Sequence, residues 1–317
     1  MATATLLLPE RGRFTGQPVP ERLARALGRA DAVAMGEAGE RAQLLRHFEL
    51  LPRGWPVAAL TRSRDAGDAA TAQWLRADPA WIRPDINGAR MLACGEGMQL
   101  SPEDAGALLP ALRPLFGDAG FPIDAPVPSR WYLRLPPGAT LPSFPGPDET
   151  LGADLFEVLA EVGDTRDAGM RRWRSLLNEA QIVLHNHPWN ARRAAAGKPP
   201  VNSLWFWGGG MLSDNVTTRQ PRVASDDVLV QALAANAGLA PSMLPSRFEQ
   251  DAGEGLHDLR DARDVGVLGS DWLQPLLAAL DDGAIRELRL DFADGAGFLL
   301  SRGQRWRFWR KPMTRLA

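Results

Sequence analysis

One stretch of the chain, residues 178–210, constrains its structure more than any other. It reads NEAQIVLHNHPWNARRAAAGKPPVNSLWFWGGG, and its polar side chains are His185, His187, Asn190, Arg192, Arg193, Lys198 and Asn202. An apolar run at residues 203–207 follows them and ends at three glycines. A helix, a Pro/Gly turn, a buried strand and a glycine turn in this order are typical of an α/β protein in which a strand end opens onto a crevice.

The local structure of this stretch can be predicted in some detail. Apolar residues at helical spacing over 171–187 predict a helix, and Pro188 disfavours helix at the residue before it. Residues 189–196 then predict a second short helix, closed by Gly197. In a strand over 203–207, Trp205 and Trp207 point to one side and Phe206 to the other. Because such a strand is apolar on both faces, we expect it to be buried between layers.

The same stretch predicts an anion pocket. Arginine pairs bidentately with phosphate and carboxylate oxygens, and glycines let a ligand approach the backbone closely. The candidate ligand-binding residues are Asn190, Arg192, Arg193, Asn202, Gly208 and Gly210. The alternative is a helical hairpin that caps a sheet, with the asparagines bonding turn backbone and both arginines solvated. Both interpretations predict that replacing Arg192 or Arg193 by alanine leaves folding intact.

Several motifs at fixed spacing resemble a known family. The set is His187-Pro-x-Asn190, Arg192 or Arg193, Gly197, Pro200-x-Asn202 and Trp205-x-Trp207-Gly208-x-Gly210. It resembles a signature of the archaeal-type cofactor-independent phosphoglycerate mutases, which belong to the alkaline-phosphatase-like metalloenzymes. The whole chain is more similar to a bacterial offshoot, the RpfE-type regulatory proteins, through Leu6-Leu-Leu-Pro9, Gly16-Gln17-Pro18, Trp131-Tyr-Leu-Arg134 and Asn178-Glu-Ala-Gln181.

The resemblance implies a metal site that this sequence does not complete. The resembled enzymes use two divalent metals held by Asp and His, with a Ser or Thr nucleophile, because metals neutralise an anionic phosphate ester. The chain has four histidines, of which only His257 follows the Trp-x-Trp-Gly motif. Residues 263–268, where the resemblance implies an Asp/His-rich strand end, carry only Asp264. A two-metal site therefore cannot be assembled by matching.

A few single residues remain as candidate metal ligands or nucleophiles. His185 and His187 could share a metal only in extended chain, since residues two apart do not share a helix face. We favour a surface or capping role for both. Thr61 or Ser63 could be a nucleophile by position after a predicted strand at 55–61, but no base partner can be named for either. The catalytic residues are therefore left unassigned.

Composition bounds the class of protein. The chain has 317 residues, with 45% hydrophobic and 23% charged, which indicates a globular protein. A formal net charge of -2 makes nucleic acid an unexpected partner. A single cysteine, Cys94, excludes an internal disulfide and fits a reducing compartment. Neither a signal peptide nor a membrane-spanning run is recognisable, so we expect a cytoplasmic protein with no membrane partner.

Alternating strands and helices predict an α/β fold, mainly a layered α/β/α sheet. Predicted strands are 4–8, 55–61, two within 81–93 that turn at Asn87-Gly88, 130–135 and 265–268; predicted helices are 20–30, 41–51, 69–75, 101–116 capped by Ser101, 225–237 capped by Ser225, and 271–280. Residues 242–263 predict an irregular loop. The proline-rich residues 137–150 predict a linker or loop between an α/β portion at 1–136 and a second at 151–317.

The C-terminus predicts an antiparallel meander of strands 287–292, 298–301 and 305–310. Arg305-Trp306-Arg307-Phe308 alternates strictly, which would give one basic and one apolar face. One interpretation is an anion or nucleic-acid patch with aromatic stacking. We favour the other, an edge strand whose arginines are solvated, because the global charge gives the first no support.

The sequence therefore predicts a non-catalytic relative of the phosphoglycerate mutases with a regulatory role, which binds a phosphorylated or carboxylated metabolite. One alternative is an active phosphoryl-transfer metalloenzyme with a rearranged metal site, a phosphatase or a mutase-like isomerase. The other is a protein-interaction module, in which some of the eleven tryptophans lie at an interface. No cofactor is expected, and a divalent metal only if the protein is an enzyme.

Overall fold

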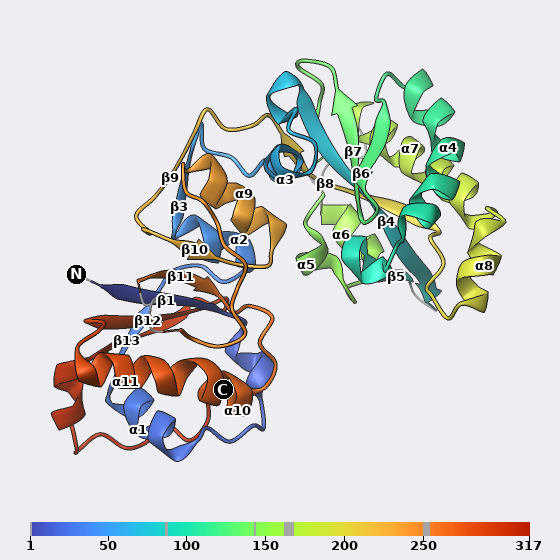
Figure 1. Ribbon diagram of the computed structural model, residues 1–317. Helices are drawn as coiled ribbons and strands as arrows, with labels where there is room; N and C mark the ends of the chain where they lie inside the picture. Colours follow the sequence, from blue (N-terminus) through green and yellow to red (C-terminus); the bar gives the residue numbers. More distant parts are fainter. Residues whose placement is uncertain (1, 86–87, 143, 162–167, 250–253) are drawn as a thin grey trace. The chain divides into compact units, whose positions relative to one another are not determined.

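The chain folds into two compact units (Figure 1). The computed structural model describes residues 2–85, 88–142, 144–161, 168–249 and 254–317. The first unit is made of Met1–Leu51 and Asn215–Ala317, and the second of Pro52–Asp214. The chain thus leaves the first unit, builds the whole second unit and then returns. The boundary that we predicted at residues 137–150 lies inside the second unit.

The first unit is built on a six-stranded sheet in the order β10-β11-β1-β12-β13-β2. Its first four strands in this order are parallel, and β13 and β2 extend it antiparallel. In order across the sheet, the bounds are β10 (Val223–Ala224), β11 (Gly255–Asp258), β1 (Thr3–Leu8), β12 (Glu287–Phe292), β13 (Ala296–Ser301) and β2 (Asp31–Ala34).

Helices cover both faces of this sheet, which confirms the layered α/β/α prediction for the first unit (Figure 1). On one face lie α1 (Glu21–Arg29), α10 (Val265–Leu268) and α11 (Gln274–Asp282). Their apolar side chains form one core with alternate residues of β1 and β12, such as Leu6 and Leu290. The other face carries α2 (Glu40–Leu45), α9 (Val228–Asn236) and the antiparallel pair β3 (Phe48–Leu51) and β9 (Asn215–Thr218).

The second unit is a five-stranded sheet centred on one long strand. That strand, β4, pairs antiparallel with β5, β7 and β8, and β6 pairs with β7. The strands are β4 (Gln73–Asp85), β5 (Gly88–Cys94), β6 (Ile123–Val127), β7 (Arg130–Leu135) and β8 (Ser203–Gly210); the helices are α3 (Val57–Asp65), α4 (Pro102–Asp118), α5 (Pro147–Thr150), α6 (Leu155–Glu161), α7 (Ala168–His185) and α8 (Trp189–Ala195).

The organising stretch forms the predicted elements. Helix α7, the break at Pro188, α8 and β8 follow in that order. Trp205 and Phe206 on β8 are fully buried and pack against Phe144 and Trp173. The prediction that this strand is buried on both faces is therefore confirmed. Helix α4 begins with the predicted cap, since the Ser101 hydroxyl accepts from the backbone N–H of Asp104.

Several local predictions are wrong. Residues 55–61 belong to helix α3, residues 41–51 split into α2 and β3, β4 begins within 69–75, and 265–268 is helix α10. Short apolar runs do not distinguish a buried strand from a buried helix, and the packing of the unit decides between them. Helix α9 is capped by Asp227, not Ser225. The hairpin of β4 and β5 is confirmed, with Asn87 outside the described residues.

The C-terminal meander is only partly confirmed. Strands β12 and β13 are antiparallel as predicted. The third predicted strand is wrong, because Arg302–Trp306 forms a 3-10 helix and the remaining residues have no regular structure. Its Ser301 and Gln304 form a capping box, which favours a helical turn over a hairpin. Among the helices that the structure describes, none is long and apolar enough to cross a membrane.

Candidate functional site

Two aspartates lie level with each other at the carboxyl end of the parallel sheet in the first unit. Asp258 of β11 and Asp291 of β12 are both in register with Leu7 of β1, which lies between them. Residues in register on parallel strands point to the same face, and two strand spacings put their Cα atoms roughly 10 Å apart. Ligand sites of open α/β sheets lie at this edge, so the two carboxylates mark the candidate site.

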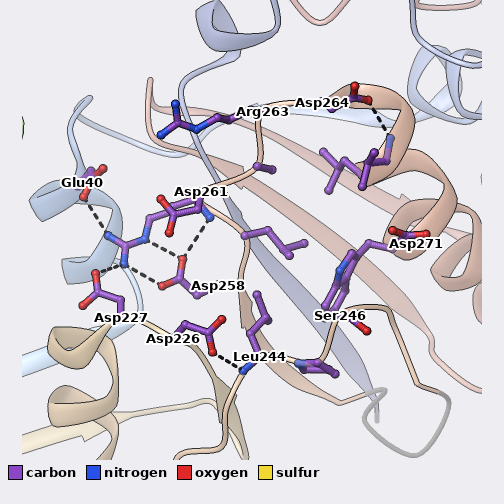
Figure 2. Close-up of a pocket in the computed structure, with 17 residues that line it drawn as sticks. Glu40, Asp226, Asp227, Leu244, Ser246, Asp258, Asp261, Arg263, Asp264 and Asp271 are labelled. Carbon is purple, nitrogen blue, oxygen red and sulfur yellow. Dashed lines mark hydrogen bonds and ion pairs between the residues drawn. The ribbon is translucent and has the colours of Figure 1, made fainter. Parts of the chain in front are cut away.

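Each oxygen of Asp258 is held by the protein itself (Figure 2). Arg260 donates from Nε to one oxygen and from Nη2 to the other, both at 2.8 Å. The Ser225 hydroxyl donates to the carboxylate at 2.7 Å. The same guanidinium reaches Asp227 at 2.8 Å and Glu40 at 3.1 Å. One buried arginine therefore binds three carboxylates that come from separate segments of the chain.

The charges set the protonation states of this pair. Burial by itself would raise the pKa of Asp258, but hydrogen bonds and the charge of Arg260 lower it below its ordinary value. Burial would likewise lower the pKa of Arg260, but its carboxylate partners raise it. Asp258 is therefore ionised and Arg260 is protonated at neutral pH, and the pair is a fixed buried ion pair.

Asp291 is also paired with an arginine. It is fully buried, and Arg46 donates to its two oxygens at 2.6 and 3.0 Å. His47 Nε2 lies 2.7 Å from one of these oxygens. The neighbouring Gln43 donates to the carbonyl oxygens of Leu8 and Asp291. Helix α2 and the residues after it thus supply Arg46 and His47 to Asp291, and Glu40 to the arginine that binds Asp258.

A hollow of about 480 Å³ opens beside the Asp258 cluster (Figure 2). Two of its lining residues are basic, Arg260 and Arg263. Seven are acidic: Glu40, Asp226, Asp227, Asp258, Asp261, Asp264 and Asp271. The formal charge of the lining is therefore 2 − 7 = −5, which disfavours an anionic ligand such as a phosphate ester.

Comparison with known proteins points to one group of enzymes. Over 79 residues the chain is 37% identical to a probable 2,3-bisphosphoglycerate-independent phosphoglycerate mutase of Geobacter sulfurreducens. Over 35 residues it is 51% identical to a 2,3-bisphosphoglycerate-independent phosphoglycerate mutase of Methanosarcina barkeri. The chain is related to these mutases. The matches cover 25% and 11% of this chain but only 16% and 9% of the two mutases. No family model matches the chain.

Solved structures give a weaker likeness. A cofactor-independent phosphoglycerate mutase from Thermoplasma acidophilum aligns over 95% of this chain and 89% of its own, with a TM-score of 0.41 and 14% identity. A protein from Pyrococcus horikoshii aligns over 95% of this chain and 87% of its own, with a TM-score of 0.41 and 12% identity.

The residues at the strand ends do not fit the divalent metals that the resemblance implies. A metal needs carboxylate oxygens or imidazole nitrogens that are open to it. Here Arg260 and Arg46 occupy the oxygens of Asp258 and Asp291, and their positive charges oppose a cation. Across the described ranges, no group of three His, Cys, Asp or Glu residues could hold a metal ion.

Among the described residues, the remaining histidines form no metal-binding group with the strand-end aspartates. His257 precedes Asp258 and points to the opposite face, where its ring packs 5.2 Å from Trp272. His185 is exposed at the end of α7, and His187 Nδ1 accepts from the backbone N–H of Trp189. Neither therefore joins a metal-binding group among the described residues.

The predicted anion-pocket residues are held mainly by the protein. Arg193 is 1% exposed, and its guanidinium donates to Asp104, to the Met98 carbonyl and to the Pro199 carbonyl. Asn190 bonds the backbone of Leu184 and Val201, and Asn202 bonds the N–H and carbonyl of Ile82. Arg192 differs, because its guanidinium lies on the surface over the Trp189 ring.

Two of the predicted glycines serve close packing. Gly208 and Gly210 have φ of +63° and +157°. A Cβ at Gly208 would lie 2.7 Å from Cβ of Val57, and one at Gly210 would lie 2.7 Å from Cβ of Pro56. These glycines therefore let β8 pass close to the start of α3. Most of the predicted ligand-binding residues thus have a structural role. Ligand binding by these residues stays a prediction.

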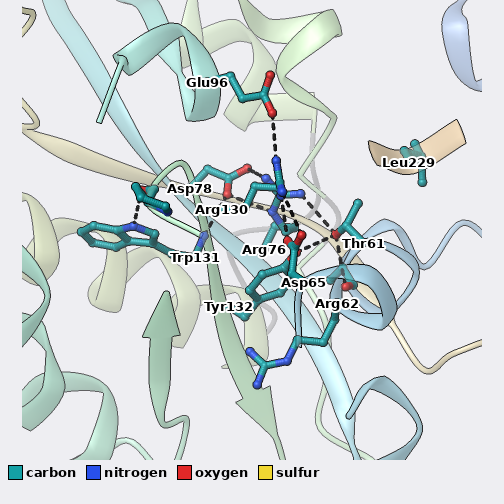
Figure 3. Close-up of polar contacts among 12 residues, drawn as sticks. Thr61, Arg62, Asp65, Arg76, Asp78, Glu96, Arg130, Trp131, Tyr132 and Leu229 are labelled. Atoms are coloured by element: carbon teal, nitrogen blue, oxygen red, sulfur yellow. Dashed lines mark hydrogen bonds and ion pairs between the residues drawn. The ribbon is translucent and has the colours of Figure 1, made fainter. Parts of the chain in front are cut away.

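A second polar cluster is buried in the second unit (Figure 3). Arg76 and Asp78 on β4 form a bidentate ion pair at 2.9 and 2.8 Å. Burial raises the pKa of Asp78, although Arg76 and the Trp207 Nε1–H at 2.7 Å act against the rise. The Nε1–H of Trp207 thus binds a buried carboxylate, so this polar group of the motif also has a structural partner.

One of the two nucleophile candidates, Thr61, belongs to this cluster. The Thr61 hydroxyl donates to the Val57 carbonyl and lies 2.9 Å from the Tyr132 hydroxyl, which is 2.6 Å from Asp65. Burial raises the pKa of Tyr132. Ser63 donates to the Leu60 carbonyl. Both hydroxyls lie on helix α3, so their predicted position after a strand is wrong.

Sequence reasoning missed the strand-end aspartates. Asp258 falls within residues 242–263, which we predicted to be an irregular loop, and Asp291 lies inside a correctly predicted strand. The available signal was short: an aspartate at or next to the end of a short segment that contains leucine, in LHD and in LRLDF. Arg260 is only two residues from Asp258, but Ser225 and Arg46 come from distant segments, and only the assembled sheet brings them to these carboxylates.

Proposed function

We propose that this protein is a non-catalytic relative of the cofactor-independent phosphoglycerate mutases that acts in regulation inside the cell. The observation that carries the proposal is the pairing of both strand-end aspartates with arginines, Asp258 with Arg260 and Asp291 with Arg46. Metal-dependent phosphoryl transfer needs cations at the reacting phosphate. The guanidinium groups of Arg260 and Arg46 are already paired with carboxylates, so they cannot neutralise a reacting phosphate in place of metal ions.

The energetics of the pairs support the same proposal. Removing one partner of a buried ion pair costs about 3–5 kcal/mol, because the other charge is left uncompensated. A metal that took Asp258 would displace from it Arg260, which is 7% exposed and is also held by Glu40 and Asp227. We therefore infer that these ion pairs stabilise the fold. The sequence similarity to the mutases then reflects common descent without mutase activity.

Metal content tests this proposal. Protein purified without chelators is expected to contain much less than one equivalent of Mn, Zn or Mg per chain by elemental analysis. It is also expected not to convert 3-phosphoglycerate into 2-phosphoglycerate when Mn²⁺ is added. Two tightly bound metals per chain, or turnover that depends on added metal, would establish the active-enzyme alternative instead.

We further propose that regulation involves a phosphorylated or carboxylated metabolite bound near α8 and β8. Arg192 supports this, since its surface guanidinium is accessible to an anion. A charge-assisted bond to an anion contributes about 1.5–3 kcal/mol. Wild-type protein is expected to gain melting temperature in millimolar 3-phosphoglycerate or sulfate, and Arg192→Ala to lose that gain. If the wild type shows no such shift, the metabolite proposal fails while the non-catalytic one stands.

A further inference from the structure

The C-terminal segment, residues 302–311, combines exposed aromatic rings with basic side chains. It reads RGQRWRFWRK, with five basic and three aromatic residues among ten. Trp306, Phe308 and Trp309 are 66%, 78% and 68% exposed. Three large aromatic side chains exposed together on a protein surface mark an interaction site, because water covers them at a cost in free energy.

This segment is anchored at both ends. Gln304 donates to the Leu299 carbonyl and to Asp31, and the Arg307 guanidinium donates to the Arg29 carbonyl. Beyond the segment, Met313 N–H donates to the Ala24 carbonyl and Leu316 is buried in the core of the first unit. The aromatic rings are therefore presented to solvent by a fixed backbone.

A basic hollow of about 250 Å³ adjoins the segment. Its floor is apolar, with Leu277, Leu280 and Leu300. One acidic residue lines it, Asp281, which pairs with an arginine of α1 at 3.5 Å. Five arginines line it: Arg22, Arg25 and Arg29 from successive turns of α1, with Arg302 and Arg305 from the segment. The formal charge of the lining is 5 − 1 = +4, whereas the whole chain carries −2.

The chemistry of the two features is complementary. Arginine forks match phosphate oxygens, and aromatic faces stack on nucleic-acid bases whatever the base. The Arg305 guanidinium lies 5.0 Å from the Trp306 ring centroid, so the same few residues supply both kinds of contact. Single-stranded nucleic acid offers both partners along one flexible chain, phosphates for the hollow and base faces for the rings. The chain's negative charge restricts attraction of a polyanion to this region.

We propose that the hollow and the C-terminal segment together bind single-stranded nucleic acid. Backbone phosphates lie against the arginines of α1 and of residues 302–305, and unpaired bases stack on Trp306, Phe308 and Trp309. Duplex is excluded from stacking because its bases are already paired and covered. This activity is separate from the proposed relation to the mutases, since the hollow and the strand-end aspartates are lined by different residues.

Fluorescence anisotropy of the full chain tests the proposal. A labelled oligothymidylate or oligouridylate of about 12 nucleotides is the probe, a length within the usual single-strand footprint, at about 50 mM salt. Wild-type protein is expected to bind it with an affinity that falls as salt rises, because phosphate contacts release counterions. Arg302→Glu/Arg305→Glu and Trp306→Ala/Trp309→Ala are each expected to weaken binding about tenfold or more.

The matched control is Arg41→Glu/Arg219→Glu, which makes the same charge change at two exposed arginines of the first unit outside the hollow. It is expected to bind within about twofold of wild type, since Arg41 on α2 and Arg219 after β9 belong to the sheet face opposite α1. Unchanged melting temperatures establish that all variants are folded. The proposal is overturned if wild type does not bind, if the control weakens binding equally, or if duplex binds as tightly. Binding to phosphatidylglycerol vesicles but not to the oligonucleotide also overturns it.

Discussion

Replacing Arg193 by alanine is expected to lower the free energy of unfolding by about 3–5 kcal/mol, the cost of leaving a buried charge without its partner. Arg193 is a residue of α8, its guanidinium contacts the first turn of α4, and it is 1% exposed. Its loss removes a 2.7 Å ion pair to Asp104 and leaves the carbonyl oxygens of Met98 and Pro199 without their donors. Urea unfolding of wild type and variant measures the difference.

Arg192 provides the matched control, because it is the same residue type one position away. Its surface guanidinium lies 4.6 Å from the Trp189 ring centroid. An exposed cation–π contact contributes about 0.5–1 kcal/mol, so Arg192→Ala is expected to cost no more than that. Equal costs for the two variants would contradict the buried ion pair. The prediction from sequence that Arg193→Ala leaves folding intact is at odds with this burial.

Trp205→Ala is the second substitution with a large expected effect. The indole is fully buried in β8, packs 5.5 Å from Phe144 between ring centroids, and donates from Nε1 to the Pro145 carbonyl. Truncating a large aromatic in a core costs about 3–5 kcal/mol, because packing is lost and a cavity is left. The expected result is a loss of that size in the free energy of unfolding from denaturant titration.

Trp309→Ala is the control for Trp205→Ala. Trp309 is 68% exposed, and surface substitutions usually change stability by no more than about 0.5 kcal/mol. A cost below about 1 kcal/mol for Trp205→Ala would place β8 at a surface, contrary to the structure. Combined with Trp306→Ala, the same Trp309 change is expected to weaken oligonucleotide binding. The buried tryptophan thus affects stability, and the exposed tryptophans affect binding.

Some features of the candidate sites can be predicted from the sequence, and others cannot. Low histidine content after the Trp-x-Trp-Gly motif already argued against a two-metal site. The sequence could not show that Arg46 occupies the carboxylate of Asp291, since these two residues lie 245 positions apart. Likewise, Arg305 and Trp306 alternated as in a strand, but the capping box of Ser301 and Gln304 turns this segment into a helical turn.

The sequence by itself determined the elements whose signals are local. The cap at Ser101, the break at Pro188 and the apolar run of β8 each act within one turn or one strand, so their residues suffice to predict them. The tertiary structure alone decided which strands are neighbours and which charges meet. A second unit inserted after Leu51 separates β1 from β11 and β12 along the chain, yet those strands pair directly. Whether a polar side chain binds a ligand or another residue depends on such distant contacts, because its hydrogen-bonding groups take whatever partners the fold brings to them.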